Sequence, residues 1–316
     1  MIVTKISAIA LTVADIDLSI RFYTQALEFK VVEDCTFEPS SYDRLASIPE
    51  SRVRLVTLQL GEEYIELIQY LDLEAKPIPK DSQSNDLWFQ HLAIVVKDID
   101  RAYQHLQKFE IKPISKKPQT IPQDNKLAAG VRAFKFRELD HHSLELIWFP
   151  PGKGKDRWQH SENELFLGID HSAIAVRDTE KSLRFYRDLL GLTPAKTNLN
   201  QGQEQADLDN LSAPELEVTP LQPKESSIGV ELLAYQQPQG GRERSQDWQI
   251  NDLPHLHYLM EVDDLADIEE LKPQVDFISP KAIAKLAVGI ALPNLYRYDR
   301  GCLIADPDGH AVLLVQ

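Results

Sequence analysis

Histidine and glutamate recur at matching places along this sequence of 316 residues. Four apolar segments each close on an aspartate, namely Asp15, Asp98, Asp178 and Asp264. Seven residues before these aspartates stand Ala8, His91, His171 and His257, and the middle of a later apolar segment in each repeat holds Glu66, Glu145, Glu231 and Leu313. A carboxylate between apolar neighbours is costly to bury unless it faces a cavity or an ion. Imidazole together with carboxylate is a common ligand set for Zn²⁺, Ni²⁺, Mn²⁺ or Fe²⁺. The pattern therefore predicts divalent-metal binding.

The third repeat shows most clearly which elements must position these residues. Alternation over residues 168–178 predicts a strand with Ile174 and Val176 on one face and His171 on the other. Asp178 suits a helix N-cap, and apolar residues then recur at helical spacing until Gly191. Each repeat continues with further strand-like segments, so the predicted unit is βαβββ. The fourth copy is predicted to enter its helix after Asp264.

The repeat and its linker predict the domain organisation. The period is roughly 80 residues, which is longer than that of solenoid repeats, so each copy is expected to be a supersecondary unit. A Pro- and Gly-containing stretch follows the second copy. We therefore expect one domain over residues 1–152 (modules 1 and 2), a linker over 153–165, and a second domain over 166–316 (modules 3 and 4). Their cores are expected to be separate.

Two motifs carry a resemblance to a known family. The segment from His171 to Asp178 with its following Ser-Leu-Arg-Phe-Tyr, and the segment from Asp140 to Leu146, resemble the vicinal oxygen chelate superfamily. That superfamily includes glyoxalase I, methylmalonyl-CoA epimerase, bleomycin-binding proteins and extradiol dioxygenases. The resemblance implies an α+β fold of four βαβββ modules, paired into two half-open mixed β-barrels, with metal ligands at the His and Glu positions described above.

The resemblance also implies two ligand sets. With modules paired in chain order, the first barrel offers Glu66, His91 and Glu145, with Ala8 in the remaining position. The second barrel offers His171, Glu231 and His257, with Leu313 in the remaining position. We expect the second set to be the principal metal site, with Glu231 as a candidate catalytic base.

For function, the resemblance implies a divalent-metal-dependent lyase or isomerase, glyoxalase I-like or epimerase-like. Its substrate would be a small molecule that chelates the metal through neighbouring oxygens. Two alternatives remain: an extradiol-type ring-cleaving dioxygenase, and a non-catalytic protein that sequesters small molecules such as antibiotics. In extradiol dioxygenases the ligand Glu comes from the fourth module, where this chain has Leu313, which disfavours the first alternative.

Composition excludes some classes of partner. The formal net charge of −15 argues against nucleic acid and anionic membrane surfaces. No apolar run approaches membrane-spanning length, and the two cysteines, Cys35 and Cys302, lack metal-type spacing. A cytoplasmic location is the expectation, and the oligomeric state stays open. In the predicted hairpin turns, His141, His142 and His310 are expected to be solvated.

Overall fold

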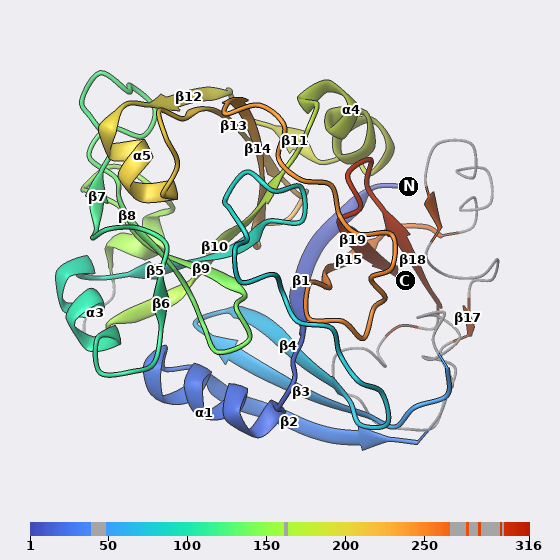
Figure 1. Ribbon diagram of the computed structural model, residues 1–316. Coiled ribbons are helices and arrows are strands. Elements are labelled where there is room, and N and C mark those ends of the chain that lie inside the picture. The colour runs from blue at the N-terminus through green and yellow to red at the C-terminus, as the bar shows by residue number, and fades with distance from the viewer. Residues whose placement is uncertain (39–48, 161–163, 266–275, 278–283, 286–297, 299) are drawn as a thin grey trace.

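The computed structural model describes residues 1–38, 49–160, 164–265, 276–277, 284–285, 298 and 300–316 (Figure 1). The helix predicted after Asp264 lies outside the described residues. The described elements form an α+β protein of two curved mixed sheets with few helices, as the repeated βαβββ pattern predicts. Among the described helices, none has the length and apolar character needed to cross a membrane.

Sheet A is built from the first and last quarters of the chain. Its strands follow the order β16 (Asp276–Phe277), β18 (Arg300–Ala305), β19 (Ala311–Val315), β15 (Leu256–Val262), β1 (Val3–Thr12), β4 (Glu63–Tyr70), β3 (Val53–Leu60) and β2 (Lys30–Phe37), with β17 (Ala284–Lys285) beside β18.

Sheet B is built from the two middle quarters. Its strands follow the order β11 (Thr193–Pro194), β13 (Glu215–Gln222), β14 (Gly229–Gln237), β10 (Phe166–Ala175), β5 (Gln90–Val96), β9 (Ser143–Trp148), β8 (Arg132–Arg137) and β6 (Lys112–Pro113), with β12 (Asn198–Gln201) beside β13 and β7 (Gln119–Thr120) beside β8.

The pairing of modules differs from the sequence prediction. Strand β1 of module 1 pairs antiparallel with β15 of module 4, and β5 of module 2 pairs antiparallel with β10 of module 3. The predicted pairing of modules in chain order, 1 with 2 and 3 with 4, is therefore wrong. Each sheet contains strands from both sides of the 153–165 linker.

Strand edges explain why the repeat did not reveal the partner. In every module the first strand pairs in parallel with the last strand of its own module, as β1 does with β4 and β5 with β9. Its other edge stays open for the first strand of another module. Backbone N–H and C=O groups on that edge are the same whichever module supplies the partner. A repeat identifies equivalent positions, but it leaves the choice of partner to side-chain packing.

Three helices begin where the aspartates predict: α1 (Ile16–Ala26), α3 (Ile99–Leu106) and α4 (Thr179–Leu183), which continues as the π-helical η2 (Arg184–Leu189). Two further helices, α5 (Gln203–Asp209) and the short 3₁₀ helix η1 (Asp156–Gln159), have no capping side chain. The Asp15, Asp98 and Asp178 carboxylates each accept a backbone N–H of the first helical turn. Gly191, with φ of +75°, follows the third helix.

One large apolar core joins the two sheets. It contains Leu11 of β1 and Tyr258 of β15 from sheet A, Leu92 of β5 and Ile174 of β10 from sheet B, and Phe22 of α1. The predicted separation of the cores is therefore wrong as well. Alternate residues of β1, such as Ala8 and Ala10, belong to a smaller cluster on the opposite face of sheet A. Because side chains alternate along a strand, the His and Glu positions lie on the faces turned away from the shared core.

Candidate metal centre

Four of the predicted ligand residues come together in sheet B, two from each half of the chain. On β10 and β5, His171 is paired with Ala93, and Ala173 with His91. The next strands add the carboxylates, since Ala93 is also opposite Glu145 of β9 and Ala173 is opposite Glu231 of β14. The two alanines thus lie at the centre of the group, and their small side chains leave the space that the larger ones enter.

His91, Glu145 and His171 each place a ligand atom within 4.8 Å of the other two, and Glu231 approaches this group through His171. Nε2 of His91 lies 3.2 Å from Oε2 of Glu145. Nε2 of His171 lies 3.4 Å from Oε2 of Glu231 and 3.9 Å from Oε2 of Glu145. The two imidazole centroids are 5.7 Å apart. Atoms bound to one ion at about 2.0–2.2 Å are separated by about 3–4 Å, so this spacing suits a shared metal ion.

Burial and charge give the four groups different protonation behaviour. Burial lowers the pKa of His91 to about 4, so its imidazole is neutral. Burial acts to raise the pKa of Glu145, but His91, Lys135 and His171 outweigh it and lower that pKa to about 2. Burial raises the pKa of Glu231. Burial acts to lower the pKa of His171, yet Glu231, Asp170 and Glu145 raise it to about 9. Without a metal ion, protonated His171 therefore supplies the positive charge among the carboxylates.

The donor set passes a test of fit to a divalent ion. Among the described residues, neither ring nitrogen of His91 has a well-aligned hydrogen-bond partner, although the side chain is 3% exposed. A buried polar group without a partner is costly, and an ion between Nε2 and the carboxylates would satisfy it. Two imidazoles and two carboxylates suit a borderline ion of the kind predicted.

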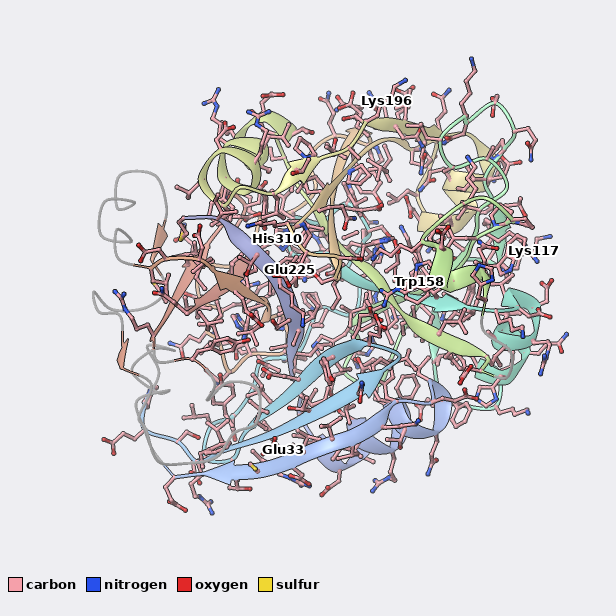
Figure 2. All side chains as sticks on the ribbon, turned by 180° about the vertical axis from the view of Figure 1, so that it is seen from behind. Glu33, Lys117, Trp158, Lys196, Glu225 and His310 are labelled. Carbon is pink, nitrogen blue, oxygen red and sulfur yellow. The ribbon has the colours of Figure 1, made fainter. Side chains whose placement is uncertain are left out.

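Residues outside the ligand set orient His171. Its Nδ1 lies 3.1 Å from Oδ2 of Asp170, which leaves Nε2 free to face the other ligands. The indole Nε1 of Trp158 donates to Oδ1 of Asp170 at 3.0 Å, and Lys155 Nζ lies 3.6 Å from the same oxygen. A Cβ on Gly168 would lie 2.8 Å from the Trp158 ring, so this close approach requires glycine. Figure 2 shows Trp158 against the strands of sheet B.

Sequence reasoning missed this role of the linker. Trp158 belongs to the 3₁₀ helix η1, inside the segment 153–165 that was predicted to be only a connection. The tryptophan in an otherwise polar stretch was the available signal, because tryptophan is highly buried on average and a solvated linker seldom contains one. Outer hydrogen bonds of this kind fix the orientation and basicity of a metal-ligating histidine.

The four residues open into a pocket of about 240 Å³. Its walls are largely apolar and include Ile147, Val218 and Leu233. One buried cation, Lys135 of β8, also lines it and donates to Oδ1 of Asp209 at 2.6 Å. Burial acts to lower the pKa of Lys135, but Asp209 and Glu145 outweigh it and raise that pKa. The ammonium is thus charged.

Sheet A holds the other two predicted ligands without completing a set. Here Ala10 of β1 is opposite both His257 of β15 and Glu66 of β4, while Leu259 is opposite both Ala8 and Leu313. Alanine and leucine therefore occupy two of the four positions. The predicted grouping of His171 and Glu231 with His257, and of Glu66 with His91 and Glu145, is wrong because it followed the wrong pairing of modules.

Glu66 and His257 remain buried polar groups. Neither Glu66 oxygen, nor Nε2 of His257, has a hydrogen-bond partner among the described residues. Burial, and then the charge of Glu33, raise the pKa of Glu66 to about 8. Burial lowers the pKa of His257 to about 4, and its Nδ1 lies 3.1 Å from Nε2 of His255. Both groups are thus uncharged at neutral pH.

A second acidic cluster, Glu138, Asp140 and His142, lies in the β8–β9 turn, and its atoms are already used. Glu138 accepts the backbone N–H of His142 and approaches its Nδ1 at 2.8 Å, while Asp140 accepts the N–H of Ala14. The matching β18–β19 turn buries His310 beside Asp306. The expectation that His142 and His310 are solvated is wrong, because both are buried and Nε2 of each lies 2.9 Å from a backbone carbonyl oxygen, that of Leu253 and that of Ala175 respectively.

Comparison with known proteins identifies the family. The sequence model of the glyoxalase/bleomycin resistance protein/dioxygenase superfamily matches residues 5–146 and 168–314. The chain belongs to that superfamily. Two matches in tandem agree with the four-module repeat. No curated protein matches the chain in sequence.

Solved structures share the superfamily fold over the whole chain. Glyoxalase I from Zea mays is 15% identical, with a TM-score of 0.60, and the alignment covers 99% of this chain and 92% of that one. A putative dioxygenase from Bacillus subtilis is 11% identical, with a TM-score of 0.55, covering 99% of this chain and 85% of that one. At such identity the likeness concerns the fold.

Proposed function

We propose that the protein is a divalent-metal-dependent lyase or isomerase acting on a small substrate that presents two neighbouring oxygens. The observation that supports this proposal most strongly is that all four equivalent positions in sheet B hold a His or a Glu, namely His91, Glu145, His171 and Glu231. A bound divalent ion would supply Lewis-acid stabilisation of an oxyanion or enolate. The tandem match to the superfamily, and the fold shared with a glyoxalase I, support this proposal.

The chain's own residues divide the remaining tasks. Glu145 stays deprotonated beside His91, which suits a permanent ligand. Glu231 has the more open side chain, 23% exposed against 7% for Glu145, and burial raises its pKa. A carboxylate with a raised pKa is a better base, so Glu231 Oε2 is our candidate for taking a proton from the substrate carbon.

The site composition argues against the dioxygenase alternative. Non-haem Fe(II) oxygenases of the facial-triad kind use two His and one carboxylate and leave three positions open. His91, Glu145 and His171 match that composition, but Glu231 beside His171 is a fourth donor that would take one of those positions from substrate and oxygen. The alternative of a metal-free binding protein makes the opposite prediction to ours, namely no catalysed proton exchange.

Proton exchange tests the proposal without knowledge of the natural substrate. Metal-loaded protein is incubated in D₂O with small 2-hydroxycarbonyl compounds and 2-hydroxy acids, and loss of the C–H signal is followed by NMR. We expect exchange that requires the metal and falls about 10²- to 10⁴-fold in Glu231→Gln, which keeps an oxygen donor. Binding without exchange across the panel would favour a sequestering protein, and O₂ uptake with catechols a dioxygenase.

A further inference from the structure

The buried lysine of the pocket occupies a position that is uncharged in the other three modules. In each module, the last strand carries the position that holds Glu in modules 1 to 3 and Leu in module 4. One residue on the neighbouring strand is paired directly with it. These residues are Thr57, Lys135, Pro220 and Leu303, opposite Glu66, Glu145, Glu231 and Leu313. Directly paired residues project from the same face of a sheet, so Lys135 shares the pocket with Glu145. Module 2 alone has a charge at this position.

Lys135 is held rigidly beside the ligand set. Its side chain is 3% exposed, and its Nζ lies 2.6 Å from Asp209 Oδ1 and 5.9 Å from the ring centroid of Phe89, which itself contacts the His91 ring. Asp209, at the end of α5, is fixed in turn by Gln205 Nε2 and Tyr235 OH on its other oxygen. Helix α5 thus fixes the ammonium through a carboxylate that is already fully engaged.

The ammonium has donors to spare. It carries three N–H groups, and the hydrogen bond to Asp209 uses one of them. Burying an ammonium is costly, and a single carboxylate that is shared with a tyrosine and a glutamine offsets only part of that cost. A further oxygen acceptor in the pocket would complete its hydrogen bonding.

The charges around the pocket favour an anion. Its charged lining residues are three lysines, Lys135, Lys153 and Lys196, and three carboxylates, Glu145, Asp170 and Glu231. These charges balance, so a divalent ion would make the loaded pocket positive. Lys196 is exposed and lies on the outside of the molecule, at the top of Figure 2. Lys135 is the lysine beside Glu145.

We infer that the substrate is a small carboxylic acid with an oxygen on its second carbon, and that Lys135 binds its carboxylate. The inference rests on the proposed function. One carboxylate oxygen and the oxygen of carbon 2 are the neighbouring pair for the metal, and the other carboxylate oxygen accepts from Lys135. Such charge-assisted hydrogen bonds are the strong ones, so Lys135 is a specificity-determining residue.

A matched pair of ligands tests this assignment. Glycolate and hydroxyacetone have the same shape and the same neighbouring oxygens, but only glycolate is an anion. Binding is followed by proton relaxation of each ligand on Mn²⁺-loaded protein, after elemental analysis of its metal content. We expect glycolate to bind more tightly, and Lys135→Met to weaken glycolate roughly 10- to 100-fold while changing hydroxyacetone less than about threefold.

Three variants separate recognition from structure. Asp209→Asn breaks the same ion pair without removing the lysine, and hydroxyacetone binding to this variant measures the structural effect of that loss. An equal loss of glycolate and hydroxyacetone binding in Lys135→Met would assign Lys135 a structural role and overturn the inference. Lys117→Met, at an exposed lysine outside the pocket lining, is the control and should change glycolate binding less than about threefold. If Lys135→Met does not fold, the double variant Lys135→Met/Asp209→Asn removes both buried charges and should lose the preference for glycolate.

The remaining outcomes are also decisive. Equal binding of the two ligands to metal-loaded protein would overturn the inference and leave the proposed metal site standing. Protein that takes up no Mn²⁺, Zn²⁺ or Ni²⁺ would overturn the proposed function, and the inference with it.

Discussion

His91 and His171 come from opposite sides of the 153–165 linker, and their ring centroids lie 5.7 Å apart. The antiparallel pairing of β5 with β10 brings them together, with Ala93 and Ala173 between them. Neither half of the chain contains both. The candidate metal centre therefore exists only when modules 2 and 3 pair.

This pairing predicts the behaviour of the separated halves. A polypeptide of residues 1–152 has β1 and β5 with open edges, because their partners β15 and β10 lie in the other half. Open edges of this kind promote association. We expect the half-chain to aggregate or self-associate, and to fold as a monomer only when residues 153–316 are added. Size-exclusion chromatography with circular dichroism measures this. A monomeric half with a cooperative melting transition would contradict the account.

Much of the fold and of the site could be predicted from the sequence. The strand and helix pattern, the N-cap aspartates and all four residues of the centre follow from local periodicity and the repeat. The strand pattern alone does not predict the pairing of modules, because the open edges of β1 and β5 are chemically alike. A signal was nevertheless present: only the pairing of modules 2 and 3 places a His or Glu in every one of the four positions, His91, Glu145, His171 and Glu231.

Local patterns did not show the burial of Lys135 or the residues that Trp158 contacts. A lysine in a strand is usually a solvated residue, and its burial depends on Asp209, which lies more than 70 residues away. Trp158 donates a hydrogen bond to Asp170, which orients His171, and this chain of contacts exists only in the folded protein.

Asp170 is predicted to tune metal affinity without being a ligand. Asp170→Asn removes the negative charge beside Nδ1 of His171, so the imidazole is less basic and less well oriented. We expect metal affinity to fall about 10- to 100-fold. Competition with a chromophoric chelator measures the change. Asp188→Asn, an exposed carboxylate of η2, is the control and should leave affinity unchanged. Equal affinities in all three proteins would remove Asp170 from this role.

Metal binding is predicted to release a proton from His171. The pKa of this histidine is raised to about 9 in the metal-free protein, and a metal ion requires the neutral imidazole. Apparent affinity should therefore rise about tenfold per pH unit between pH 6 and 8, and level off above pH 9. Calorimetry in buffers of different ionisation enthalpy counts the protons. The absence of proton release at pH 7 would show that His171 is already neutral.

Glu66 is predicted to make stability fall as pH rises. Its pKa in the folded protein is about 8, above the ordinary value of 4.5, so the folded state binds the proton more tightly. Stability from this group is complete below about pH 4.5 and is lost as pH rises towards 8. Glu66→Gln keeps a neutral side chain of the same shape.

The variant should therefore match the unsubstituted protein at low pH and exceed it at pH 8 by on the order of a few kcal/mol. Urea unfolding at several pH values measures the difference. Glu62→Gln, on the same hairpin with a side chain that is 82% exposed, should change stability little. A difference that does not grow with pH would mean that Glu66 is ionised in the folded protein.

Metal stoichiometry in the full chain tests the central claim most directly. Purified protein, loaded with Zn²⁺ and freed of excess, should contain one ion per chain. His91→Ala should abolish that ion, because His91 belongs to the sheet B set, whereas His257→Ala, the equivalent position of sheet A, should retain it. Loss of the ion in His257→Ala, or its retention in His91→Ala, would contradict the pairing of modules 2 and 3 as the source of the site.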